Sequence, residues 1–364
     1  MTKKILEILI PTYRRTNAAI SAIESVLSCD NLNIGVACHS NGPDEELERF
    51  ALLRPNLRYG FFAENRGAIA NFRQLVETSK ADYVFFLSDE DRVDAKHLTS
   101  LINFIANKQY GAVLCSVVEQ TGEDYFSLSA LEGEQLTFHD LLMIFPMSPT
   151  YISGYCFRRD LLSNEIIRNA FDNNEANVYP HVLLRNAISE HSSIGLFARS
   201  VVIKGKDYSQ GGDSHAHVEL SNSNLQMSSG QLLNPRIYGG SARARQFYYI
   251  MPIFDKQLSQ ISFIKRSFAR YYLLSIWLNM TASAHLVAAE IADLPSLKST
   301  IEDYRRENDC IISTVGLYNR ILSIKRPRVK VLAIKLMMYL ARVMRMIIFF
   351  RRFGVLRTYR QIAR

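Results

Sequence analysis

The sequence predicts an α/β fold in which helices flank an open, largely parallel sheet. In the first two hundred residues, short apolar runs alternate with amphipathic stretches, which is the pattern of strands joined by crossover helices. The composition, with 48% hydrophobic and 21% charged residues, is that of a globular chain with a sizeable core. Five cysteines without a C-x-x-C pair predict neither a disulfide framework nor a zinc knuckle, and favour a reducing compartment.

Apolar runs and helical periodicity define the expected elements. Residues 17–28 and 68–79 carry apolar side chains at the spacing of one helical face and are predicted crossover helices. The expected strands are residues 5–10, 34–38, 57–62, 83–87 and 112–118, with 194–203 returning a strand to the sheet.

The later part of the chain has a different amino-acid composition. After Lys206 it is rich in Gly, Ser, Asn and Asp, which predicts a long loop, and from about Ser241 its apolar segments suggest helices. We therefore expect a first domain over residues 1–240, a helical region over 241–324 and a basic tail over 325–364.

Polar residues follow each of the first four predicted strands, where ligands of an open α/β sheet bind. The sharpest signal is the run of carboxylates Asp89, Glu90 and Asp91 after a strongly apolar strand. These carboxylates repel one another unless a cation lies among them, and Mg²⁺ commonly binds one or two carboxylates together with substrate phosphates. Such a metal would stabilise the charge on a departing diphosphate. A solvated acidic turn that caps the next helix is the alternative interpretation.

The turn before the second predicted helix carries Arg66 and Gly67. Arginine pairs with phosphate oxygens, and a helix N-terminus favours anions, so this turn could contact the phosphates of a donor. Alternatively, Gly67 only permits a tight turn and Arg66 lies in solvent.

The segments ILIPTYRR, SNGPD, ENRGAIANF and DYVFFLSDEDRV resemble, in their order and spacing, the motifs of family 2 glycosyltransferases with the GT-A fold. The resemblance covers about the first 210 residues and is strongest to bacterial enzymes that build O-antigen or capsule. It implies a GT-A domain that transfers a sugar from a nucleotide-sugar donor, most simply a UDP-sugar, with Mg²⁺ or Mn²⁺ as the metal.

The resemblance also implies residue roles. Asp91 would bind the metal, Glu90 could exchange roles with it, and Asp89 would lie on the ribose side of the metal site. Ser40 and Asn41 would contact the base edge. The residues implied to bind the donor nucleotide are Pro11, Thr12, Tyr13, Ser40, Asn41, Asn65, Arg66, Gly67, Asn71 and Asp89.

Two positions depart from the family pattern. Ser40 stands where the family commonly has an acid, which affects the expected contact with the base. Inverting members also have a carboxylate base in an E-D dipeptide before a D-L-x-x-R helix start, and the best match here, residues 181–185, lacks that dipeptide. The nearest proton acceptors are Glu175, which keeps the carboxylate chemistry, and His181, which titrates near neutrality. Either residue could instead cap a helix or be solvated.

Two further segments resemble parts of such a site. Ser153 and Gly154 lie in ISGYCFRR, which is similar to the segment on the acceptor side of the family. His215 and His217 form an H-x-H pair in the polar loop and could complete a metal or phosphate site, although a solvent-exposed loop is the alternative.

The net charge of +8 is concentrated in the tail, where residues 325–364 hold twelve of the 43 lysines and arginines and no acid. On a helix, five of these basic residues face away from an apolar stripe, which predicts binding to an anionic membrane surface rather than to nucleic acid. The five are Arg328, Lys335, Arg342, Arg345 and Arg352. Basic residues break the stripe too often for a span of about 20 residues. A helix packed onto the protein by its stripe is the alternative. The stripe comprises Val329, Leu332, Ala333, Leu336, Leu340, Val343, Met344, Ile347 and Phe350.

The leading hypothesis is a metal-dependent, inverting glycosyltransferase that uses a lipid-linked saccharide acceptor. We expect it to be cytoplasmic, because Glu7 interrupts the only N-terminal apolar run that could resemble a signal peptide. The basic tail predicts that it is peripheral on the inner face of the cytoplasmic membrane. A catalytically inactive, membrane-bound scaffold that binds nucleotide-sugars is an alternative, because the E-D dipeptide is missing. A sugar nucleotidyltransferase is a weaker alternative, since such an enzyme needs a Gly-rich N-terminal loop and this chain has Pro11, Thr12 and Tyr13 there.

Overall fold

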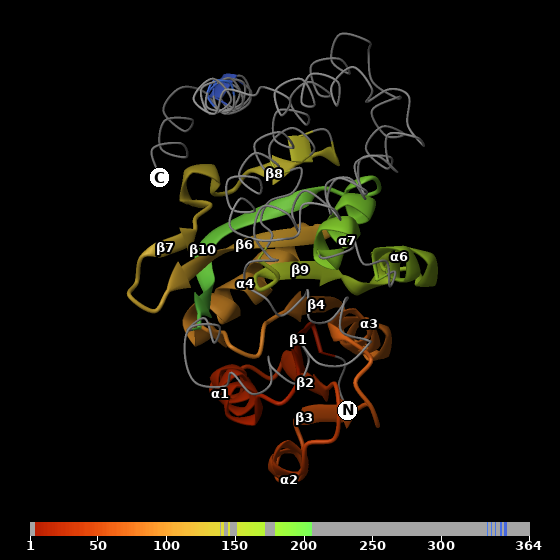
Figure 1. Cartoon of the computed structure of the whole chain (residues 1–364). Coiled ribbons are helices and arrows are strands. Elements are labelled where there is room, and N and C mark those ends of the chain that lie inside the picture. The colour runs from red at the N-terminus through yellow and green to blue at the C-terminus, as the bar shows by residue number, and fades with distance from the viewer. Residues whose placement is uncertain are drawn as a thin grey trace. The chain divides into compact units, whose positions relative to one another are not determined.

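A computed structural model describes most of the first 205 residues and a few positions near the C-terminus (Figure 1). The chain divides into two compact units. The first unit comprises Met1–Leu141, Met147–Asn173 and Tyr179–Gly230, and the second comprises Leu142–Pro146, Asn174–Val178 and Gln231–Arg364. The described residues are 4–138, 140, 141, 145, 151–171, 179–205, 333, 336, 339, 343, 346 and 347.

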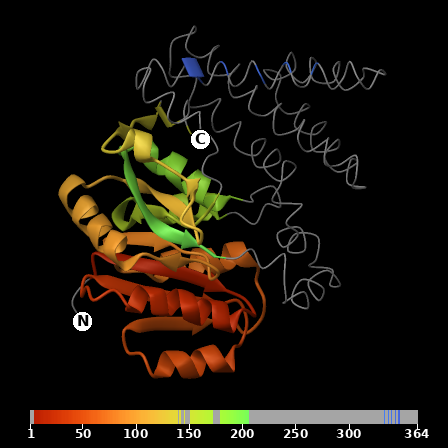
Figure 2. The ribbon, with the colours of Figure 1, turned by 90° about the vertical axis from the view of Figure 1, so that its left-hand side faces the viewer.

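The first unit contains a mixed sheet that confirms the predicted fold class. Its strands lie in the order β3-β2-β1-β4-β9-β6-β10-β5, with β7 paired to β6 and β8 paired to β10. In Figures 1 and 2 the sheet runs from β3, next to α2, towards β10. The strand bounds are β1 Leu6–Thr12, β2 Ile34–Ser40, β3 Leu57–Phe61, β4 Tyr83–Phe86, β5 Arg92–Val93, β6 Ala112–Glu119, β7 Asp124–Phe126, β8 Gln135–Leu136, β9 Tyr155–Arg158 and β10 Ile194–Lys204.

Parallel pairing puts most strand ends at one edge. β1 pairs in parallel with both β2 and β4, β2 with β3, and β6 with β10. β9 is antiparallel to both of its neighbours, β4 and β6, so those two strands still point the same way. The loops that follow β1, β2, β3 and β4 therefore leave the sheet at the same edge.

Six described helices flank the sheet. All six predicted strands and both predicted helices are confirmed, with ends within two residues of those expected. α2 and α4 were not predicted, although each begins with an aspartate cap: Asp44 accepts a hydrogen bond from the Leu47 N–H, and Asp94 from the His97 N–H. The helix bounds are α1 Thr16–Leu27, α2 Glu45–Leu52, α3 Ala68–Thr78, α4 Ala95–Lys108, α6 Asn164–Ala170 and α7 Pro180–Ser189.

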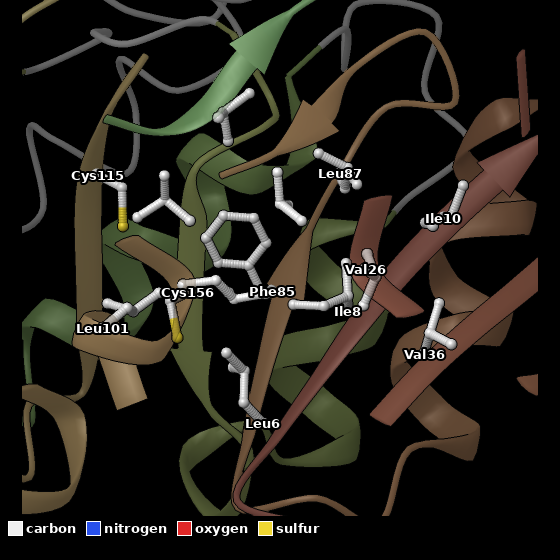
Figure 3. Close-up of a cluster of buried hydrophobic side chains, with 14 of the residues drawn as sticks. Leu6, Ile8, Ile10, Val26, Val36, Phe85, Leu87, Leu101, Cys115 and Cys156 are labelled. Carbon is white, nitrogen blue, oxygen red and sulfur yellow. The ribbon is translucent and has the colours of Figure 1, made fainter. Parts of the chain in front are cut away.

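The strand pleat distributes apolar side chains over both faces of the sheet. Ile8 of β1 and Phe85 of β4 belong to a core cluster with Val26 of α1 and Leu101 of α4 (Figure 3). On the opposite face, the ring of Phe86 lies 5.5 Å from that of Phe72 in α3. The sheet is thus covered on both faces, which leaves its edge of strand ends as the place for polar residues.

The described positions near the C-terminus are helical. Among them, Leu336 is 57% exposed, Tyr339 64% and Ile347 42%. No helix among the described residues is long and apolar enough to cross a membrane. The expected boundaries at residues 240 and 324 lie outside the described residues.

Candidate active site

The loops after β1 and β4 meet because these strands are parallel neighbours. Leu9 of β1 lies opposite Phe86, the last residue of β4, and β1 continues to Thr12 beside the loop that follows β4. The Thr12 hydroxyl donates a 2.8 Å hydrogen bond to Asp89 Oδ2. Burial raises the pKa of Asp89, whereas the nearby guanidinium of Arg15 and the bond from Thr12 act in the opposite direction. The predicted nucleotide loop and the acidic motif therefore form one structure.

Arg15 places a positive charge on this acidic motif. Its Nη1 lies 3.1 Å from Asp89 Oδ1 and 3.3 Å from Glu90 Oε2. The preceding residue, Arg14, has a φ of 53°, in the left-handed region that non-glycine residues rarely adopt. Such a conformation costs roughly 1 to 3 kcal/mol and concentrates at functional sites. This backbone turn ends the loop, and Arg15 then occupies the position directly before α1.

Asp91 is enclosed by the protein. Its side chain is fully buried, and its Oδ1 accepts hydrogen bonds from the Tyr151 hydroxyl at 2.6 Å and the Gly205 N–H at 2.8 Å. Its Oδ2 accepts a 2.5 Å bond from the Ser153 hydroxyl. Burial raises the pKa of Asp91, and these three hydrogen bonds counteract the increase. Asp91 thus joins the acidic motif to the segment that begins at residue 151 and to the end of β10.

Gly205 is required by this packing. A Cβ atom at this position would lie 1.7 Å from the carbonyl oxygen of Glu90. No side chain fits at that distance, so only glycine lets the chain after β10 approach the acidic motif closely enough for its N–H to reach Asp91.

The acidic motif contains a pair of carboxylates suited to a cation. Within the described ranges, no group of three or more His, Cys, Asp or Glu residues is placed to hold a metal. A divalent ion commonly uses only one or two carboxylates together with substrate phosphates. Asp89 and Glu90 already share the Arg15 guanidinium, and the Glu90 side chain is 22% exposed. The two carboxylates therefore fit a cation that is completed by ligand oxygens.

A second cluster joins the turns after β2 and β3. Asn41 Nδ2 donates a 2.6 Å hydrogen bond to Asn65 Oδ1, and the Arg66 N–H donates a 2.8 Å bond to Asn41 Oδ1. The same oxygen of Asn65 accepts from the Gly67 N–H at 2.9 Å. Gly67 has a φ of 85°, and a Cβ there would meet no atom within 4 Å. Glycine serves the backbone conformation at this turn and leaves open space beside it.

Asn71 lies beneath these loops. Its Nδ2 donates to the carbonyl oxygens of Thr12 at 3.1 Å and His39 at 2.9 Å, and its Oδ1 accepts a 2.6 Å bond from His39 Nδ1. Asn71 is 2% exposed, so both of its amide N–H groups hold the ends of β1 and β2 on α3. Contact of Asn71 with a donor stays a prediction.

The remaining nucleotide-site candidates line the same edge. Ser40 ends β2 and is buried. Pro11 and Tyr13 are partly buried, and a Cβ on Gly42 would lie 3.4 Å from Tyr13 Cε2, which places the tyrosine ring beside the turn after β2. The guanidinium of Arg14 lies 5.2 Å from the centroid of the Tyr13 ring.

Of the two candidates for the catalytic base, only His181 lies among the described residues. His181 lies in the first turn of α7 and is 2% exposed, with its ring centroid 4.8 Å from that of Tyr155 and 5.9 Å from that of Tyr179. Glu175 lies outside the described residues, as do His215 and His217.

The small residues expected on the acceptor side do lie beside the acidic motif. Ser153 is buried and bonds to Asp91, and Gly154 has a φ of 97°. Sequence reasoning assigned no role to Arg15 or Tyr151. The double arginine after PTY was a visible signal for the first, whereas no local pattern marks a tyrosine that pairs with an acid sixty residues earlier in the chain.

Residues 7–166 match the family model described as Glycosyl transferase family 2, and this stretch contains both the β1 loop and the acidic motif. Over these residues the chain is similar to family 2 glycosyltransferases. The chain is 25% identical over 208 residues to a protein of Escherichia coli (strain K12) named as a colanic acid biosynthesis glycosyl transferase, WcaA. That match covers 56% of this chain and 68% of the relative.

Two solved structures are also similar to the chain. The crystal structure of Staphylococcus aureus TarS 1–349 has a TM-score of 0.45 and 14% identity, and the match covers 84% of this chain and 92% of that one. The mannosyltransferase PcManGT from Pyrobaculum calidifontis, in complex with GDP-Man and Mn²⁺, has a TM-score of 0.46 and 13% identity, with coverages of 94% and 87%.

Proposed function

We propose that this glycosyltransferase is metal-dependent and inverting, and moves a sugar from a nucleotide-sugar donor, most simply a UDP-sugar, to a lipid-linked saccharide. The product would belong to a bacterial surface polysaccharide such as O-antigen or capsule. The observation that carries the proposal is the meeting of Thr12 and Arg15 with Asp89 and Glu90 at the carboxyl edge of the sheet. The family match and the similarity to a protein named for colanic acid biosynthesis support the same class of reaction.

Glu90 is the better candidate for the metal-facing acid, with Asp89 beside it. Asp91 already accepts three hydrogen bonds and is fully buried, whereas the Glu90 side chain is partly exposed. This favours the exchange of roles between Glu90 and Asp91. A bound Mg²⁺ or Mn²⁺ would offset the negative charge that develops on the departing diphosphate.

The donor would lie across the loops after β1, β2 and β3. Tyr13 offers a ring at the turn after β2, and the backbone around Gly67 is open to a ligand. The guanidinium of Arg66 lies 4.9 Å from the centroid of the Phe62 ring, beside that turn. Arg66 is thus a candidate contact for donor phosphates.

Glu175 is the better candidate for the catalytic base. A general base must come within hydrogen-bonding reach of the acceptor hydroxyl. His181 packs against two tyrosine rings and is almost fully buried, which suits a residue that holds α7 in place. Glu175 also keeps the carboxylate chemistry of the family.

The basic tail would hold the enzyme at the inner face of the cytoplasmic membrane. Leu336 and Ile347, both on the predicted apolar stripe, are helical and exposed. Apolar side chains that face outward on a helix rich in Lys and Arg suit the boundary between headgroups and acyl chains. Each basic residue near an anionic surface adds about 1 kcal/mol of attraction.

A panel of nucleotide-sugars tests the proposal. Thermal shift with and without Mn²⁺ should identify a donor that stabilises the protein only when the metal is present, and that donor should be hydrolysed slowly or transferred to a lipid-linked acceptor. Binding without hydrolysis or transfer would instead favour the inactive scaffold. Formation of a nucleotide-sugar from a nucleoside triphosphate and a sugar phosphate would favour the nucleotidyltransferase.

A further inference from the structure

The acidic motif has a resident positive group supplied by its own chain. A single nitrogen, Arg15 Nη1, lies within salt-bridge distance of Asp89 Oδ1 and of Glu90 Oε2. Asp91, the third acid, accepts hydrogen bonds from two hydroxyls and a backbone N–H. Arg15 therefore pairs with the same two carboxylates that suit a metal ion.

The position of Arg15 is held by the backbone and remains accessible. Arg15 follows the left-handed residue Arg14 and directly precedes α1, so the backbone on both sides fixes where its side chain begins. Its side chain is 23% exposed, so a ligand can reach it. On the other side, the Thr12 hydroxyl holds Asp89 Oδ2, which leaves Oδ1 as the oxygen that Arg15 shares.

A guanidinium and a divalent ion cannot use the same carboxylate oxygens together. Two cations at hydrogen-bonding or coordination distance from one oxygen repel each other strongly in a partly buried site. Arg15 and a divalent ion therefore compete for Asp89 Oδ1 and Glu90 Oε2, and Arg15 must leave an oxygen before a metal ion binds it. An anionic diphosphate eases this exchange, because arginine forms strong paired hydrogen bonds with phosphate oxygens.

We propose that Arg15 is a positioning residue that serves as the exchangeable counter-ion of Asp89 and Glu90, and that it makes metal binding depend on the donor. Without the donor, Arg15 offsets one of the two negative charges and keeps the affinity of the carboxylates for a divalent ion low. With the donor, the Arg15 guanidinium moves to the diphosphate and the carboxylates become available. This inference rests on the proposed function and adds an order of binding to it, in which the donor binds before the metal ion.

Titration of the full-length protein with Mn²⁺ alone tests the counter-ion role without any turnover. Arg15→Gln should bind Mn²⁺ roughly tenfold more tightly than the wild type, because removing a partly buried partner frees both carboxylates. Arg14→Gln is the matched control, because it removes the same charge from the neighbouring residue, whose side chain is exposed. It should change the Mn²⁺ affinity less than about threefold. Adding Glu90→Gln to Arg15→Gln should abolish the gain.

Repeating the titration with UDP tests the coupling. UDP should raise the Mn²⁺ affinity of the wild type more than that of Arg15→Gln, and Mn²⁺ should raise the UDP affinity by the same factor, since coupling is reciprocal. Arg15→Met, which keeps an apolar stem, provides a second charge-free variant if Arg15→Gln folds poorly.

Equal Mn²⁺ affinities in Arg15→Gln and Arg14→Gln would overturn the inference, as would an Arg15→Gln protein that binds no Mn²⁺. The proposed function is judged separately, since Mn²⁺-dependent donor binding by the wild type could persist while these variants show no difference.

Discussion

The Ser153 hydroxyl donates a 2.5 Å hydrogen bond to the carboxylate of Asp91, although 62 residues separate them. The same hydroxyl accepts a 2.8 Å bond from the backbone N–H of Ser88, at the start of the acidic turn. Two bonds therefore fix the expected acceptor-side segment to the loop that carries the acids. A displacement of either segment must therefore move the other. Asp91 is held in this contact, whereas Glu90 is partly exposed, so we expect the two neighbouring acids to have different roles.

Asp91→Asn and Glu90→Gln should separate stability from activity. Asp91→Asn puts an amide donor where three donors converge, and should lower the free energy of unfolding by about 1 to 3 kcal/mol. Glu90→Gln changes a partly exposed acid and should leave stability within about 0.5 kcal/mol while transfer is lost. Urea unfolding and initial rates with saturating donor measure both quantities. Unchanged stability in Asp91→Asn would instead return the metal-facing role to Asp91.

Gly205→Ala should disturb the acidic motif from outside it. The added methyl group would collide with the Glu90 carbonyl, and relief requires the backbone of the motif to shift. We expect a stability loss of roughly 1 to 3 kcal/mol and weaker donor binding. Gly35→Ala is the matched control, because its Cβ would lie 3.3 Å from the flexible side chain of Lys4. Equal behaviour of the two variants in thermal unfolding and donor titration would contradict the prediction.

His39 should make the protein less stable in mild acid. Burial lowers the pKa of His39 below its usual value, and the charge of Arg58 acts in the same direction. The unfolded chain takes up this proton near pH 6.5, so below that pH the unfolded state binds more protons and unfolding becomes easier, down to the lowered pKa. His39→Gln removes this contribution. Urea unfolding at pH 7.5 and 5.5 should show a larger loss in the wild type, and equal losses would disprove the assignment.

The base assignment predicts different defects for Glu175 and His181. Glu175→Gln should lower kcat by roughly 10² to 10⁴-fold with little change in melting temperature. His181→Ala removes a ring packed between two tyrosines and should mainly lower stability, by about 2 to 4 kcal/mol. Rates measured well below both melting temperatures separate the effects. A stable His181→Ala protein with the larger kcat loss would transfer the role to His181.

The tail should bind anionic vesicles through both its charge and its apolar stripe. Replacing the exposed Leu336 and Ile347 by Ser should reduce sedimentation with such vesicles even at low salt, because burying each side chain contributes roughly 1.5 to 3 kcal/mol. Ala333→Ser, with little apolar area to lose, is the control. High salt should weaken the wild type by screening its charges. If the intact protein does not sediment and the double variant unfolds, the stripe is a packing surface.

Local patterns determined the strands, the crossover helices and the edge where polar loops gather. Apolar runs such as residues 83–87 must be buried whatever their neighbours are, and parallel strands place their following loops at one edge. The sequence could therefore predict that the acids of residues 89–91 and the loop at 11–15 belong to one site. α2 and α4 carried cap signals at Asp44 and Asp94 that went unused.

Only the tertiary structure decided which way each polar side chain of that site faces. Asp91 turns towards a backbone N–H 114 residues away, while Glu90 meets Arg15 across 75 residues. Glu90 and Asp91 carry the same functional group at neighbouring positions of one loop, so no local pattern predicts which of them is enclosed. Their partners are set by the burial of one and the partial exposure of the other, and burial is a property of the assembled sheet and loops.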